Sequence, residues 1–367
     1  MNTKKFRAEF KHILTYVPFK IRKDIILEVA NMAKNRKDIE IVKTAFGKTF
    51  NFSSFDAIED AICLIIDKYP KIITIRDKSD VFERGLVSSA MFEDTLLVYA
   101  VQKRYEKVLC KVIEEYPNEL IENWDLLDGY VYDSIWHACA YYELTEPCLK
   151  VLEMYDKALK EVDSHAGPIR VADLNKVKLY KHLIKDRDED GDTFLHIAAQ
   201  NRLNKVLKKA IEVDSSLAKV TNKEGESFLH LVYIGKETYE TVLKTNPSLF
   251  ALVDNYGMSV AHVMLTSEPY NECTDILLKA IEKCPEILKI KNDYSSTIAH
   301  TAAHMGNEGE LDKYKICLAS SKYMPETIFM EDKYGKTFLD YIKDEKIKAE
   351  CIKIAKKNLT EKLDLIK

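Results

Sequence analysis

The sequence predicts an all-α fold, an α-solenoid of stacked helix-turn-helix repeats with finger loops and a helical cap at each end. Two observations carry this prediction. A short string, made of a tight turn, a Thr or Ser and an apolar helix start, returns every 32 to 40 residues in the second half of the chain. A helix-stop signal follows the copies at a similar distance. Because one such helix pair cannot bury its apolar faces alone, the repeats must stack on one another.

The repeated string is clearest at residues 191–199, which read Gly-Asp-Thr-Phe-Leu-His-Ile-Ala-Ala. Its Thr193 can cap the N-terminus of a helix, since a hydroxyl oxygen accepts a hydrogen bond from an amide that has no partner inside the helix. We take a Thr or Ser in this position as the start of a repeat. The eight starts are Thr49, Thr95, Ser134, Thr193, Ser227, Ser259, Thr297 and Thr337.

A second signal marks where the second helix of each repeat should end. Proline cannot continue a helix and disfavours helix in the residue before it. The stops lie 20 to 28 residues after their caps, which suits two short helices with a tight turn between them. The stops are Tyr69-Pro70, Tyr116-Pro117, Asn246-Pro247, Cys284-Pro285 and Met324-Pro325, with Tyr155-Asp156 and Val213-Asp214 in the equivalent place of two other repeats.

The segments between a stop and the next cap are predicted to form the fingers. After repeats four to seven they span 12 or 13 residues, which fits an extended finger that ends in a tight Gly turn. After repeats one to three they span 17 to 37 residues, so insertions are expected near 79–91 and 160–186. The second insertion carries apolar residues between Leu174 and Ile184, and we expect an extra helix there.

The two ends of the chain lie outside the repeat pattern. Residues 1–48 carry apolar stripes at helical spacing, the last of them from Ile39 to Phe46, and are expected to form an N-terminal helical cap. Residues 346–367 are expected to form a C-terminal capping helix. An alternative interpretation of the N-terminal segment is an adaptor motif. Its Val-Pro-Phe-Lys-Ile at 17–21 resembles the start of an F-box, which recruits a ubiquitin ligase scaffold.

The repeated string resembles the ankyrin repeat, in which Thr-Pro-Leu-His-x-Ala opens the first of two helices. Residues 193–198 match well, although Phe194 stands where the family prefers Pro. The resemblance covers about residues 49–345 and implies seven to eight degenerate repeats. It also implies that the recurrent His tethers the cap to the adjoining turn, and so has a structural role. These histidines are His137, His196, His230, His262 and His300.

Three segments resemble ligand-binding or catalytic motifs, but each lacks a residue that its motif requires. The Gly-Lys-Thr at 47–49 lacks the earlier Gly of a phosphate-binding loop. Residues 186–192 match the first half of an EF-hand calcium loop, but Ile197 replaces the Glu that should complete it. His300 and His304 have the spacing of metal ligands on a helix but lack the Glu of a zinc protease. We therefore expect no metal, no cofactor and no enzymatic activity.

Charge and composition narrow the class of partner. The chain has a net charge of −4, but residues 1–48 hold twelve Lys or Arg against five Asp or Glu, and 343–367 hold eight against five. Residues 49–342 therefore carry −14, which argues against nucleic-acid binding. No apolar run approaches the length of about 18 residues that a membrane span needs, and no signal peptide is expected. The eight Cys form no Cys-x-x-Cys pair, and we expect them reduced in a cytoplasmic protein.

The sequence predicts a non-enzymatic, monomeric protein-protein interaction scaffold. Solenoids bind partners on their concave face and fingers, and loop insertions often gather there, so the site is expected on repeats 1–4. Tyr and Trp dominate binding hot spots, and acidic side chains steer a basic partner surface. The candidate residues are Phe82, Trp124, Tyr130, Tyr132, Asp186, Asp188, Glu189 and Asp190.

The Lys- and Ile-rich, degenerate style of these repeats is similar to that of ankyrin proteins of intracellular bacteria, many of which are secreted into host cells. The resemblance implies a host-directed effector that binds a host protein in the host cytosol. Two alternatives remain. One is the ligase adaptor that the N-terminal segment suggests. The other is an enzyme within the irregular insertions, which would need a cluster of titratable groups apart from the repeat histidines.

Overall fold

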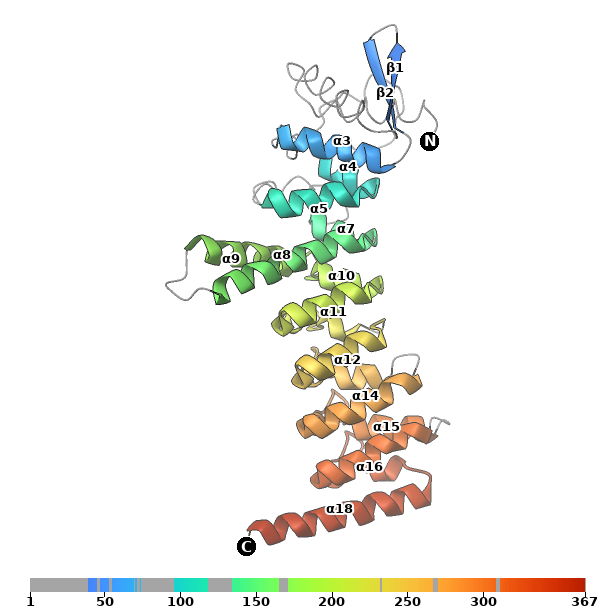
Figure 1. Cartoon of the computed structure of the whole chain (residues 1–367). Coiled ribbons are helices and arrows are strands. Elements are labelled where there is room, and N and C mark those ends of the chain that lie inside the picture. The colour runs from blue at the N-terminus through green and yellow to red at the C-terminus, as the bar shows by residue number, and fades with distance from the viewer. Residues whose placement is uncertain are drawn as a thin grey trace. The chain divides into compact units, whose positions relative to one another are not determined.

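A computed structural model describes residues 39–44, 47–52, 55–68, 70, 73, 96–117, 134–164, 171–231, 233–266, 270–307 and 311–366. The chain divides into two compact units, Met1–Asp188 and Glu189–Lys367. Each unit is built from helices that pack in pairs (Figure 1). The predicted all-α solenoid fold is confirmed for the helical repeats.

The first unit opens with an antiparallel hairpin and continues with helices. Helix α5 packs on α3, α4 and α8, and α8 packs on α7 and α9. The elements are β1 (Ile39–Thr44), β2 (Gly47–Phe52), α3 (Phe55–Lys68), α4 (Leu96–Gln102), α5 (Glu106–Glu115), α7 (Ile135–Tyr141), α8 (Thr145–Asp163) and α9 (Val171–Lys185).

The second unit stacks five repeats and ends in a long helix. Its α-helices are α10 (Phe194–Gln200), α11 (Asn204–Val213), α12 (Lys236–Thr245), α13 (Val260–Thr266), α14 (Tyr270–Lys283), α15 (Ile298–Asn307), α16 (Tyr314–Tyr323), α17 (Phe338–Tyr341) and α18 (Glu345–Ile366). Short 3-10 helices complete the repeats: η5 (Ser215–Lys219), η6 (Phe228–His230), η7 (Pro247–Ala251), η8 (Pro285–Lys289), η9 (Leu311–Lys313) and η10 (Pro325–Phe329). None of the described helices is long and apolar enough to cross a membrane.

The hairpin corrects two predictions. The stripe from Ile39 was expected to be helical, and Thr49 was expected to cap a helix, but both residues lie in strands that pair from Ile39↔Phe52 to Thr44↔Gly47. The physical reason is composition, since four of the six residues of β1 are β-branched and such side chains favour strands. Residues 1–38, which include the F-box-like segment, lie outside the described residues, so the N-terminal cap stays a prediction.

The predicted Thr and Ser caps begin helices in the second unit. Thr193, Ser227 and Thr337 each form a capping box at the N-terminus of α10, η6 and α17. The residue that follows each of the five predicted caps in the second unit is apolar and fully buried. Burying such a side chain contributes about 1.5–3 kcal/mol to the stability of the fold. These residues are Phe194, Phe228, Val260, Ile298 and Phe338.

The predicted proline stops also hold. Helices α12, α14 and α16 each end two residues before a Pro, which becomes the first residue of η7, η8 and η10. The stop predicted at Tyr155-Asp156 is wrong, because α8 continues to Asp163. Neither residue breaks a helix, and the Asp156 carboxylate pairs with Lys160 Nζ one turn later, at 2.9 Å.

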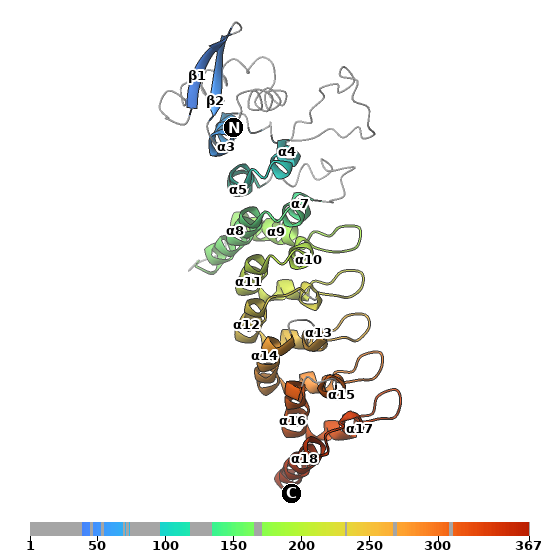
Figure 2. The same ribbon diagram turned by 90° about the vertical axis from the view of Figure 1, so that its right-hand side faces the viewer.

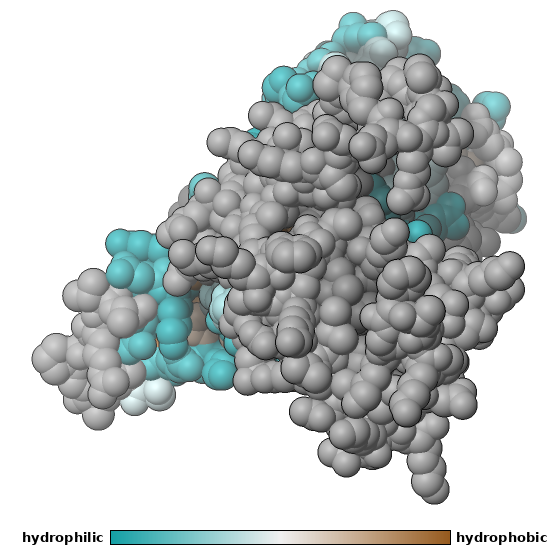
Figure 3. Space-filling model, turned by 90° about the horizontal axis from the view of Figure 1, so that it is seen from above, coloured by the Kyte–Doolittle hydropathy of each residue, from teal (hydrophilic) through white to brown (hydrophobic). Residues whose placement is uncertain are grey.

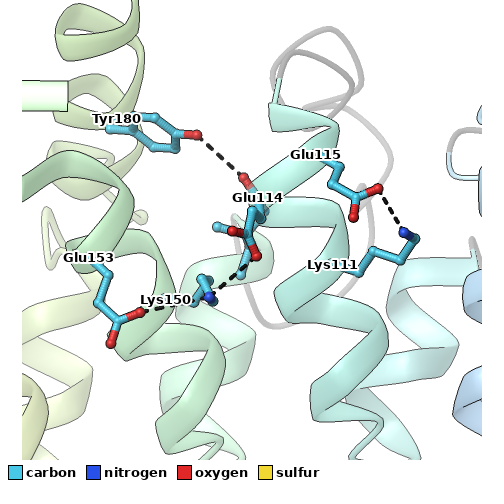
Figure 4. Close-up of polar contacts among 7 residues, drawn as sticks. Lys111, Glu114, Glu115, Lys150, Glu153 and Tyr180 are labelled. Carbon is cyan, nitrogen blue, oxygen red and sulfur yellow. Dashed lines mark hydrogen bonds and ion pairs between the residues drawn. The ribbon is translucent and has the colours of Figure 1, made fainter. Parts of the chain in front are cut away.

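The extra helix predicted in the 160–186 insertion is α9. Its Leu183 and Ile184 are buried and α9 packs along α8, while the Tyr180 hydroxyl donates to the Ile113 carbonyl at 3.4 Å. Figure 4 shows this contact beside the ion pairs that Lys150 forms with Glu114 and Glu153. Exposed ion pairs contribute only about 0–1 kcal/mol each, so apolar burial holds these helices together.

Candidate partner-binding surface

Four finger turns of the second unit are each held by an Asn or Asp side chain. The Asp254 Oδ1 accepts hydrogen bonds from the amides of Tyr256, at 2.9 Å, and Met258, at 2.8 Å. Short side chains that capture nearby amides favour turns over helices, which explains why the chain folds back here. The same pair of bonds is made by Asn222, Asn292 and Asp332.

A residue in the left-handed region closes each turn. Gly257 has φ of +71°, and an added Cβ would lie 2.9 Å from the Cα of Asn292 and from the Lys291 carbonyl oxygen of the next finger. Gly335, in the last finger, also has φ of +71° but would meet nothing within 4 Å. Ser295 takes this place in the fourth finger with φ of 56°. The left-handed turn therefore favours glycine without requiring it, and at Gly257 the next finger also leaves no room for a Cβ.

One backbone hydrogen bond joins each finger turn to the next. The fingers lie on the same side of the helices of the second unit and point the same way, to the right in Figure 2. A hydrogen-bonded series of turns is more rigid than separate loops would be. The amides of Lys223, Asn255, Asp293 and Lys333 donate to the carbonyls of Asp190, Glu224, Tyr256 and Tyr294, at 3.1, 3.0, 2.9 and 2.9 Å.

The residues that accept these bonds occupy the same turn position in successive fingers, and Tyr334 has that position in the last finger. We name this series the tip row: Asp190, Glu224, Tyr256, Tyr294 and Tyr334. The tip tyrosines, Tyr256, Tyr294 and Tyr334, are 54%, 55% and 68% exposed. The repeats therefore present three aromatic side chains in a line, with two acids before them.

Charged groups give the tip row a direction. The Tyr256 hydroxyl donates to Glu224 Oε2 at 3.0 Å, which raises the pKa of the tyrosine. At the other end, Lys333 Nζ lies 3.5 Å from the centroid of the Tyr294 ring and 5.2 Å from that of Tyr334. The tip row itself thus runs from two acidic side chains to three aromatic rings, and the exposed side chains of Lys223, Asp293 and Lys333 lie beside it.

Large apolar side chains are otherwise rare on the described surface. Eight are exposed, five of them tyrosines, and three of those five are the tip tyrosines. Tyr141 and Tyr233 are the other two, and Tyr233 stacks against the Arg202 guanidinium at 4.8 Å. In the view of Figure 3 the described surface is mostly hydrophilic. Exposed aromatic side chains set at one repeated position are candidates for partner contacts.

The four repeat histidines of the second unit are tethers, as the resemblance implies. The Ser259 amide donates to His262 Nδ1 at 3.3 Å, so the ring carries its hydrogen on Nε2 and donates it to the Ser296 carbonyl at 3.3 Å. Burial lowers the pKa of His262 to about 4, which keeps the ring neutral. Equivalent Nε2 contacts to a carbonyl of the next finger or turn are made by His196, His230 and His300, at 3.0, 3.0 and 3.2 Å.

The predicted acidic candidates fall in different surroundings. Asp186 has only 13% of its side chain exposed, and its Oδ2 lies 3.9 Å from His137 Nδ1 in the first unit. Burial raises the pKa of this carboxyl. Asp188 is half-buried, whereas Glu189 and Asp190 are exposed and belong to the second unit. Of these four acids, only Asp190 occupies the turn position that defines the tip row. A role of the four acids in binding stays a prediction.

The other predicted contacts, Phe82, Trp124, Tyr130 and Tyr132, lie outside the described residues and stay predictions. Within the described ranges, no three His, Cys, Asp or Glu side chains gather as a metal site would require. All eight cysteines are free thiols, and five of them are buried.

The tip tyrosines were missed by the sequence prediction. A signal for them exists, because Tyr directly precedes the Gly or Ser of the turn in Asn-Tyr-Gly, Asp-Tyr-Ser and Lys-Tyr-Gly. The caps and stops define the repeats without reference to these turn residues. The recurrence of Tyr at this position indicates a shared surface only once the finger turns are known to lie side by side.

No family model matches this sequence, and no curated protein matches it. Among solved structures, the chain is similar to the ankyrin repeat domain of Bcl-3, a member of the IkappaB protein family, with 16% identity, a TM-score of 0.47, and coverage of 70% of this chain and 97% of that one. It is also similar to one chain of the complex between the predatory endopeptidase Bd0816 from Bdellovibrio bacteriovorus and the immunity protein Bd3460, with 16% identity, a TM-score of 0.29, and coverage of 56% of this chain and 97% of that one. The capped helix pairs, histidine tethers and hydrogen-bonded fingers give this chain an ankyrin-repeat fold.

Proposed function

We propose that this protein is a non-enzymatic scaffold that binds a partner protein through the tip row of its second unit. The observation that carries the proposal is the alignment of Tyr256, Tyr294 and Tyr334 at one position of three successive, hydrogen-bonded fingers. Tyrosine is enriched among the residues that dominate binding energy at interfaces. Its ring offers apolar area while its hydroxyl remains hydrogen-bonded to water or partner.

Preorganisation supports the same proposal. Ordering a flexible side chain or loop at an interface costs about 0.5–1.5 kcal/mol for each immobilised side chain. The finger turns are already held by their Asn and Asp side chains and by the bonds between neighbours. A partner that docks on the tips therefore meets a surface whose backbone needs little further ordering.

The biological setting rests on the sequence. The style of the repeats favours a host-directed effector in the host cytosol, with a host protein as partner, and the acids at 186–190 favour a basic surface on that partner. The long fingers of repeats 1–3 are a second candidate surface. The ligase-adaptor alternative predicts that residues 1–48 capture a ligase scaffold.

A comparative pull-down with the full chain tests the proposal. The baits are the wild type, the triple variant Y256S/Y294S/Y334S, and Y233S as a matched control, because Tyr233 is also exposed but lies outside the tip row. We expect partners enriched by the wild type and by Y233S to be lost with the triple variant. Truncating a hot-spot residue costs at least about 2 kcal/mol, which is more than tenfold in Kd.

A fourth bait, with 79–91 removed, separates the two candidate surfaces. This deletion leaves α9 in place, unlike removal of 160–186, which would take away a helix that packs on α8. Partners that survive the triple variant and are lost with the deletion would place the site on the fingers of repeats 1–3 and contradict the tip-row proposal.

A further inference from the structure

We propose that the tip row recognises a proline-rich segment in the polyproline II conformation, with prolines at every third position and a basic residue one turn beyond them. This inference rests on the proposed function of the tip row and names the chemistry of its partner. It is argued from three properties of the row: its spacing, its aromatic chemistry and its charge.

The spacing that helix packing implies for successive fingers matches one turn of a polyproline II helix. Packed helices lie about 8–10 Å apart, and each finger belongs to the next helix pair in the stack. Polyproline II advances about 3.1 Å per residue with three residues per turn, or about 9 Å per turn. Every third ligand residue therefore faces the next tip. An α-helix advances only about 5.4 Å per turn, and every third residue of a β-strand points to the opposite face.

The tip tyrosines supply the chemistry that such a ligand needs. Proline-rich segments dock on aromatic side chains and lose little entropy, because their backbone is already extended. Their carbonyl groups have no internal hydrogen bonds and can accept from the hydroxyls of Tyr294 and Tyr334, whereas the Tyr256 hydroxyl already donates to Glu224. Tyr256, Tyr294 and Tyr334 offer three rings at successive repeats, which is enough for three prolines.

The charged side chains in and beside the tip row indicate which part of the ligand is neutral and which part is basic. Lys333 Nζ already lies over the rings of Tyr294 and Tyr334, so a cationic side chain there would meet a like charge. At the other end, Glu224 and Asp190 are exposed and occupy the two tip positions before Tyr256. A basic residue three positions from the proline on Tyr256 would face Glu224, and its attraction would weaken with salt.

Synthetic peptides test the spacing on the full chain. Two fluorescein-labelled peptides carry three prolines at every third position and one Arg, three positions beyond, at either the C-terminal or the N-terminal end. A third has the same composition with the prolines at every fourth position. By fluorescence anisotropy we expect one of the in-phase peptides to bind at least about tenfold more tightly than the out-of-phase peptide. Equal affinity of all three, or no binding, would overturn the inference.

Variants test the site. Y256S, Y294S and Y334S should each weaken the in-phase peptide roughly five- to tenfold, while Y233S leaves it unchanged. E224Q should weaken the peptide with Arg and leave a peptide with Gln in its place unaffected. Thermal melting identifies any variant that fails to fold. Peptide binding that survives all three tyrosine changes would also overturn the inference.

The two proposals can fail separately. If the triple variant loses its protein partners in the pull-down and no peptide binds the wild type, the tip row is an interaction surface for another kind of partner. In that outcome the polyproline inference is wrong and the proposed function stands. If the triple variant keeps every partner and no peptide binds, both are wrong.

Discussion

At the residue scale, the repeat histidines make the second unit sensitive to acid. Burial lowers the pKa of His262 to about 4, from 6.5 in an unfolded chain, and lowers the pKa values of His230 and His300 as well. A histidine with a depressed folded pKa contributes stability that is present above pH 6.5 and is lost as the pH falls towards 4.

We expect the free energy of unfolding to fall by about 2 kcal/mol between pH 7 and pH 5 because of His262 alone, at about 1.4 kcal/mol per pKa unit. Urea titrations at the two pH values measure it. H262Q should lose this part of the pH dependence, whereas H304Q, which leaves His262 in place, should keep it. The same slope in H262Q and the wild type would show that His262 is not the group that titrates.

The role of a side chain could be predicted from the sequence where the same side chain has the same role in every repeat. The His tether follows from the repeated Thr or Ser three residues before it, and its two ring nitrogens make the expected bonds. Asp186 was less predictable. It belongs to a run of acids that would all be solvated on an isolated loop, and only the fold places it against His137.

At the element scale, the strongest local signals gave correct boundaries. Prolines ended α12, α14 and α16, and hydroxyl caps began α10 and α17. Weaker signals failed. Tyr155-Asp156 has no proline, so nothing in its chemistry stops α8. The apolar spacing of β1 fitted a helix and a strand alike, and its β-branched composition was the better guide.

The finger turns give a matched pair of substitutions. G257A and G335A both introduce a side chain at φ of +71°, but only the first brings a Cβ to 2.9 Å from the backbone of the next finger. We expect G335A to cost about 1 kcal/mol for the backbone alone. G257A should cost about 2–4 kcal/mol, since overpacking adds about 1–3 kcal/mol. Equal losses in urea titrations would mean that the fingers are not packed against one another.

At the scale of the whole molecule, function depends on repetition. A single exposed tyrosine on a turn is unremarkable, but three in equivalent turns form a surface whose spacing the helix stack sets. The stack could be predicted from caps and stops. The recurrent Tyr before the turn residue is visible in the sequence, but that these tyrosines lie in one row follows only from hydrogen bonds between fingers that are about 32 to 40 residues apart in the chain.

Site-specific photo-crosslinking tests the central claim, that the tip row is the partner-binding surface, most directly. A p-benzoylphenylalanine residue replaces Tyr256, Tyr294 or Tyr334 in the full chain, and Tyr233 in the control, and keeps an aromatic side chain at each position. The account predicts that the three tip positions crosslink to the same partner and that position 233 does not. A partner that crosslinks from position 233 and from none of the three tips would contradict it.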